Sequence, residues 1–146
     1  MEFSGSVIVS ASASSVVGLL SDTKSVLEAL PGIQSSEIKD DSHLSVQVKM
    51  GTAFIKGRFN MDIEINRRSP TNVEVNGRGH GAGSSLEMHI DANVVDLGSD
   101  RCEVRWAVNA KIGGAIASLG ARFVEPTAKS YIEEFISNVR EKLEQH

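Results

Sequence analysis

The apolar residues of this chain change their spacing once, and that change limits the folds open to it. Between Ile33 and Ala110 they recur at every second position, which is the period of a strand. After Gly113-Gly114 they recur every three or four positions, which is the period of a helix. We therefore predict an α+β fold, in which the middle of the chain builds a sheet and one long helix ends it.

The segment from Ala53 to Asn66 shows the strand period most clearly. Its odd positions are all apolar or glycine, and its even positions are polar except for Phe54. This alternation is typical of an antiparallel sheet with one face in water. Residues that favour turns separate the alternating runs at 40–41, 69–72, 79–83 and 98–100. The sequence thus predicts a meander of six or seven strands.

One strand and two short helices are expected before the meander. Residues 2–10 alternate in the strand period. The next apolar groups, at Ser15–Leu20 and Thr23–Leu30, are short enough for about two helical turns each. Asp22 is a suitable N-cap for the second helix, and Pro31-Gly32 is expected to end it.

The terminal helix presents a single apolar stripe that changes character at Pro126. The stripe is rich in alanine before the proline and carries large side chains after it: Ala117, Ala121, Val124, Ala128, Ile132, Phe135, Val139 and Leu143. We expect the proline to kink or split the helix near 122–125. The back half should pack on the sheet, while the front half leaves room for an apolar cavity. Spacing alone is equally consistent with a fully packed core.

Six residues are the candidates for contact with a hydrophobic ligand in such a cavity. They are aromatic or thioether side chains expected on the inner face of the sheet or on the helix: Phe59, Met61, Met88, Trp106, Phe123 and Tyr131. Phe123 and Leu119 lie beside the stripe, close to the glycine pair. These two are expected to form a cavity mouth or a membrane-touching tip, or else to pack beneath a hairpin.

No pattern in the sequence is typical of catalysis or of a metal site. The four histidines and the single cysteine, Cys102, do not stand at zinc-ligand spacing, and no Gly-x-Ser-x-Gly motif occurs. The net charge of −4, without a long basic run, argues against nucleic acid as a partner. A single cysteine, no signal-like start and no apolar run of about 18 residues predict a cytoplasmic protein with at most peripheral membrane contact.

Three motifs carry a resemblance to a known family. They are Leu30-Pro31-Gly32, the glycine-rich run 76–83 (NGRGHGAG) and the run 113–122 (GGAIASLGAR) that opens the terminal helix. In this order the chain resembles the CoxG-like family, which is associated with carbon monoxide dehydrogenase, over Glu2 to about Leu143. That family belongs to the START/Bet v 1-like (SRPBCC) helix-grip superfamily. The resemblance implies a single domain over 1–146, with a curved sheet wrapped around the long helix.

The resemblance also implies a function. Members of the family are non-catalytic accessory proteins that link a molybdenum hydroxylase of the carbon monoxide dehydrogenase type to the inner face of the cell membrane. They are expected to hold menaquinone or another isoprenoid lipid in the cavity, without a covalent cofactor. His80 departs from the lysine or small residue expected in the glycine-rich run. Two alternatives stay open: a polyketide cyclase/aromatase-type enzyme, which needs an ionisable residue in the cavity, and a ligand-free protein-interaction module with a solid core.

Overall fold

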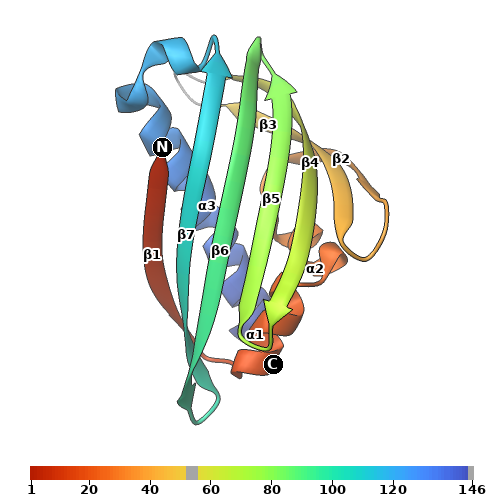
Figure 1. Ribbon diagram of the computed structural model, residues 1–146, viewed down its shortest axis with the longest axis vertical. Coiled ribbons are helices and arrows are strands. Elements are labelled where there is room, and N and C mark those ends of the chain that lie inside the picture. The colour runs from red at the N-terminus through yellow and green to blue at the C-terminus, as the bar shows by residue number, and fades with distance from the viewer. Residues whose placement is uncertain (52–55, 145–146) are drawn as a thin grey trace.

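A seven-stranded antiparallel sheet curves around one long helix (Figure 1), in a computed structural model that describes residues 1–51 and 56–144. The α+β expectation and the strand number are confirmed. The elements in chain order are β1 (Glu2–Val9), α1 (Ala13–Leu20), α2 (Thr23–Ala29), β2 (Ile33–Ile38), β3 (His43–Gly51), β4 (Lys56–Ser69), β5 (Asn72–Gly81), β6 (Ser84–Gly98), β7 (Arg101–Gly114), the 3-10 turn η1 (Ala117–Leu119) and α3 (Ala121–Glu144).

The strands are joined in the order β1-β7-β6-β5-β4-β3-β2, so the first strand pairs with the last. β2 to β7 form the expected meander, and β1 and β2 are the two edges. Residues 53–55 of the strand expected at Ala53–Asn66 lie outside the described residues, and the remainder of that run belongs to β4. Because the inner face of the sheet is apolar, its curvature leaves that face directed at α3 (Figure 1).

Both short helices form where capping side chains allow them. The Ser12 hydroxyl accepts a hydrogen bond from the Ser15 backbone N–H at 3.1 Å, so α1 begins at Ala13, two residues earlier than expected. The Asp22 carboxylate caps α2 in the same way, through the Ser25 N–H at 3.1 Å. The predicted N-cap role of Asp22 is confirmed.

The glycine-rich run 79–83 is a turn only at its end. β5 continues through Gly81 and β6 begins at Ser84, which leaves Ala82 and Gly83 as the connection. Ala82 has a φ of 51° and Gly83 a φ of 70°, both in the left-handed region that tight hairpins require. The expectation of a turn over the whole run is therefore wrong, because the earlier glycines belong to the strand.

The break before the long helix falls at Gly120 and not at Pro126. β7 extends to Gly114, η1 follows, and α3 then runs through Pro126 without interruption. Gly120 has a φ of 84°, which no α-helix can continue. Pro126 lies only five residues after the start of α3, so its ring removes one hydrogen bond, to the Arg122 carbonyl. The expectation of a split near 122–125 is wrong for this reason.

The packed core lies at the end of the sheet that α1 and α2 cover. Val16, Val17 and Ala29 of these helices are fully buried. The back half of α3 adds Val139 and Leu143, both buried in the same cluster. The expected packing of that half against the sheet is confirmed.

Gly32 provides a test of how the α2–β2 connection is held. Its φ is 71°, and a Cβ there would lie 2.5 Å from the Lys49 carbonyl oxygen. We expect Gly32→Ala to lower the free energy of unfolding by more than about 1 kcal/mol, because both strain and a backbone clash oppose it. Urea denaturation followed by circular dichroism measures the change.

Gly18→Ala is the matched control. Gly18 lies inside α1 with no atom within 4 Å of an added Cβ. That substitution should raise the free energy of unfolding by about 0.5–1 kcal/mol through helix propensity. Equal effects of the two substitutions would contradict this account of Gly32.

Candidate functional site

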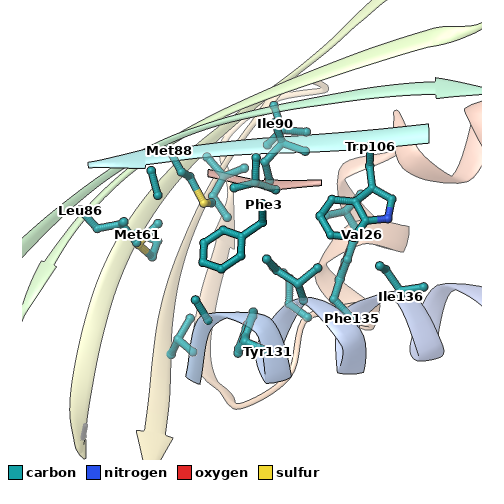
Figure 2. Close-up of a pocket in the computed structure, with 18 of the residues that line it drawn as sticks. Phe3, Val26, Met61, Leu86, Met88, Ile90, Trp106, Tyr131, Phe135 and Ile136 are labelled. Atoms are coloured by element: carbon teal, nitrogen blue, oxygen red, sulfur yellow. The ribbon is translucent and has the colours of Figure 1, made fainter. Parts of the chain in front are cut away.

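A cavity of about 330 Å³ lies between the inner face of the sheet and α3 (Figure 2). This volume falls within the range of about 300–1,000 Å³ that small-molecule sites usually occupy. Nearly all of the lining atoms are carbon or sulfur. The fully packed core that the spacing left open is therefore not the one observed.

The size of the side chains on α3 explains why this space stays unfilled. Ala128 and Thr127, in the front half of the helix, face the cavity with small side chains. The helix cannot approach the sheet more closely there, because Tyr131 and Phe135 in the next turns already meet the inner face. Close packing at the back half therefore holds open the space in front of it.

Five of the six candidate residues line the cavity: Phe59, Met61, Met88, Trp106 and Tyr131. Phe123 does not belong to the described lining. It is half-buried one position before the inward-facing Val124, and the Arg122 guanidinium lies 5.8 Å from the centre of its ring. Contact of the other five with a ligand stays a prediction.

Met61 and Met88 lie flat on the sheet because two glycines make room for them. A Cβ on Gly79 would approach the Met61 sulfur to 2.0 Å, and one on Gly77 would lie 2.7 Å from the Met88 methyl carbon. Neither glycine has a positive φ. The value of these glycines is thus the absence of a side chain, which lets the thioethers cover bare backbone.

Tyr131 closes the cavity next to the α2–β2 connection. Its hydroxyl donates a hydrogen bond to the Pro31 carbonyl at 2.8 Å. Burial raises the pKa of this phenol well above its ordinary value, and the nearby Glu134 adds to the shift. The hydroxyl is therefore neutral, and its one proton is already committed.

Several lining residues were not among the candidates. Figure 2 shows Phe3 entering the middle of the cavity from β1, with Leu86 and Ile90 on the sheet and Phe135 and Ile136 on α3. Alternation along β1 and β6 gives Phe3, Leu86 and Ile90 the inward parity. Phe135 lies on the predicted helical stripe. The signal was present for these four, but it does not separate cavity wall from packed core.

Comparison with known proteins settles the family. A family model described as CoxG, of carbon monoxide dehydrogenase, matches residues 5–144. The chain belongs to this family. The resemblance drawn from the three sequence motifs is confirmed. A comparison with curated protein sequences found no match.

Solved structures share the fold of this CoxG family member over nearly its whole length. A conserved protein from Geobacillus kaustophilus matches with a TM-score of 0.91 and 18% identity, over 99% of this chain and 96% of that one. A START superfamily protein from Mycobacterium smegmatis matches with a TM-score of 0.75 and 16% identity, over 99% and 97%. The Zhui aromatase/cyclase from Streptomyces sp. R1128 matches with a TM-score of 0.74 and 12% identity, over 99% and 94%. At these identities the likeness shows the fold alone, and the START-like helix-grip expectation is confirmed.

The CoxG cavity offers few groups for acid–base or metal chemistry. None of the described lining residues is acidic. Over 1–51 and 56–144, no three His, Cys, Asp or Glu side chains gather in a way that would hold a metal ion. Cys102 is fully buried, and this burial raises the pKa of its thiol. No helix in the described part of the chain is long and apolar enough to cross a membrane.

A second, more open hollow of about 560 Å³ lies on the outer face of the sheet and is lined by polar side chains. His43 lies at its rim between two carboxylates. Nδ1 is 2.8 Å from Asp40 Oδ1 and Nε2 is 3.0 Å from Glu64 Oε2. Only the protonated ring donates to both, so hydrogen bonds from the ring, first to Asp40 and then to Glu64, raise the His43 pKa.

This geometry predicts the direction of a pH effect. The pKa of His43 is raised in the folded state, so its stabilising contribution is fully present below the ordinary histidine pKa while the carboxylates are ionised. It is lost as the pH rises through the raised value. We expect NMR titration to give a His43 pKa above the ordinary histidine value, and Glu64→Gln to lower it.

Glu87→Gln is the control on the same outer face, since Glu87 pairs with Arg78 and not with His43. It should leave the His43 titration unchanged. A His43 pKa that Glu64→Gln does not move would show that the two side chains are not coupled in solution.

Proposed function

We propose that this CoxG family member is a non-catalytic accessory protein that holds menaquinone or another isoprenoid lipid in its internal cavity. It links a molybdenum hydroxylase of the carbon monoxide dehydrogenase type to the inner face of the cell membrane. The observation that carries the proposal is the apolar cavity of about 330 Å³ beneath the small-residue half of α3. Family membership supports the choice of partner enzyme.

The lining favours an apolar ligand with few polar atoms. Burial of apolar surface contributes about 25 cal/mol per Å², so a ring with a short isoprenoid tail gains most of its binding free energy from contact area. Phe3 and Phe59 supply aromatic surface, and Met61 and Met88 supply polarizable sulfur. These side chains suit the ring and tail of a quinone.

An enzymatic role of the cyclase/aromatase type is the alternative, and the Zhui aromatase/cyclase shows that this fold hosts such activity in another protein. It requires an ionisable group in the cavity. Tyr131 is the aromatic hydroxyl there, but its proton is bonded to Pro31 and its pKa is raised. His80 and Arg140 also reach the lining, yet His80 lies exposed at the end of β5, and Arg140 lies 3.8 Å from Glu144. The accessory role is therefore preferred.

A cavity-filling variant tests ligand binding. Ala128→Phe places a ring into the space, so we expect it to abolish binding of a short-tailed menaquinone that wild-type protein binds. The single tryptophan, Trp106, lines the cavity, and quenching of its fluorescence measures the binding. Native mass spectrometry of purified protein should also detect a co-purified hydrophobic molecule.

Ala121→Phe is the matched control, because Ala121 is exposed on α3 and does not line the cavity. It should bind menaquinone like the wild type, with the fold of both variants checked by circular dichroism. Absence of both a co-purified molecule and any quenching in the wild type would overturn the proposed ligand.

The proposed membrane contact is at η1. Leu119 is 39% exposed there, close to the exposed Arg122. An apolar side chain beside a cation suits the surface of an anionic bilayer. We expect Leu119→Glu to reduce cosedimentation with vesicles that contain phosphatidylglycerol.

Leu97→Glu is the control, since Leu97 is 49% exposed in the β6–β7 hairpin at the opposite end of the sheet (Figure 1). It should leave vesicle binding unchanged. An equal loss in both variants, or wild-type protein that stays in the supernatant, would argue against this contact.

A further inference from the structure

The hydrogen-bonding groups of the cavity wall are few, and most are already occupied. The Tyr131 hydroxyl donates to Pro31, and the Ser84 hydroxyl oxygen accepts from the Ile116 N–H at 2.8 Å. Arg140 lies 3.8 Å from the Glu144 carboxylate. His80 and Ser85 are exposed and face each other across β5 and β6, at the hairpin end of the sheet.

Trp106 differs from these groups. Its indole Nε1–H has no acceptor among the described residues. Over the same residues, no fully inaccessible side-chain nitrogen or oxygen lacks a partner, so Nε1 retains accessible surface. Trp106 therefore brings an open donor to a wall made almost wholly of carbon and sulfur.

The indole is held in place by the strand beside it. Trp106 is paired with Gly5 of β1, and a Cβ there would lie 2.8 Å from Cζ2 and 3.3 Å from Nε1 of the ring. The ring edge that carries the N–H thus rests where only a glycine leaves room. Figure 2 shows the indole extending from β7 toward α3, where Ile136 faces it. The donor is fixed before any ligand arrives.

We propose that the Trp106 indole N–H seats a carbonyl oxygen of an uncharged, planar ligand and so selects such compounds over hydrocarbons of the same shape. This inference rests on the proposed function and adds the chemical group that is recognised. The indole N–H donates only, so it favours an acceptor. Thr127, the remaining lining hydroxyl, both donates and accepts and does not select in this way.

The chemistry of the wall also specifies the absence of charge. None of the described lining residues is acidic, and Arg140 already faces Glu144. A charged group moved into this space would lose its hydration without a free partner of opposite charge. A quinone carbonyl meets the wall better, since it accepts one hydrogen bond and carries no net charge.

The test pairs a protein change with a ligand change. The probes are 2-methyl-1,4-naphthoquinone and 2-methylnaphthalene, which share a ring skeleton and differ in the carbonyl oxygens. Isothermal titration calorimetry gives Kd for each probe with wild-type protein and with Trp106→Phe. We expect the substitution to weaken naphthoquinone binding relative to methylnaphthalene by about fivefold, the effect of one neutral hydrogen bond. Comparing the ratio of the two Kd values removes the loss of ring contact area, which both probes share.

A second measurement works without a substitution. The single tryptophan gives one indole N–H signal in the NMR spectrum of ¹⁵N-labelled protein. Naphthoquinone should move the indole proton downfield, as hydrogen bonding does, and methylnaphthalene should not.

The outcomes separate the two proposals. If both probes bind and Trp106→Phe leaves their Kd ratio unchanged, the indole does not select the carbonyl, while hydrophobic ligand binding stands. If neither probe binds the wild type, the proposed function and this inference both fail. A downfield shift with both probes would also overturn the inference, because it would not arise from the carbonyl.

Discussion

One helix has to cover the inner face of a seven-stranded sheet, and the rest of the structure depends on how it does so. The back half of α3 meets the sheet and the two short helices with large side chains, and it buries Val139 and Leu143. The front half carries alanine and threonine at the same stripe and leaves a hollow. The cavity follows from the distribution of side-chain volume along one helix, since no rearranged loop among the described residues is needed to form it.

Much of this fold is readable from the sequence because burial on one face of a strand imposes a period of two. Alternation places Phe59, Met61, Met88 and Trp106 on the inner face, where the structure has them. Element ends are less predictable. The start of α3 depends on the backbone conformation of one residue, Gly120, which the apolar period does not report. Pro126 looked like the stronger break, but so near the start of a helix it removes only one hydrogen bond.

The site was predictable as a set of inward residues and not as a shape. Periodicity tells which side chains face in, yet it cannot tell whether they touch one another across the core. Phe123 illustrates the limit, since one position along α3 separates it from the inward Val124. The same holds for Gly77 and Gly79, whose role appears only when the neighbouring methionines are placed. Whether Trp106 has an acceptor likewise depends on neighbours from β1 and α3, far apart in the sequence.

The two methionines that lie over bare backbone have a consequence for discrimination by size. Each thioether has three rotatable bonds and low torsional barriers, so this part of the wall adjusts to wider or narrower guests while the strands stay fixed. Steric fit on that side is therefore a weak filter. A protein built this way tolerates variation in ring substituents and tail length, and any fidelity it has must come from directional polar contacts.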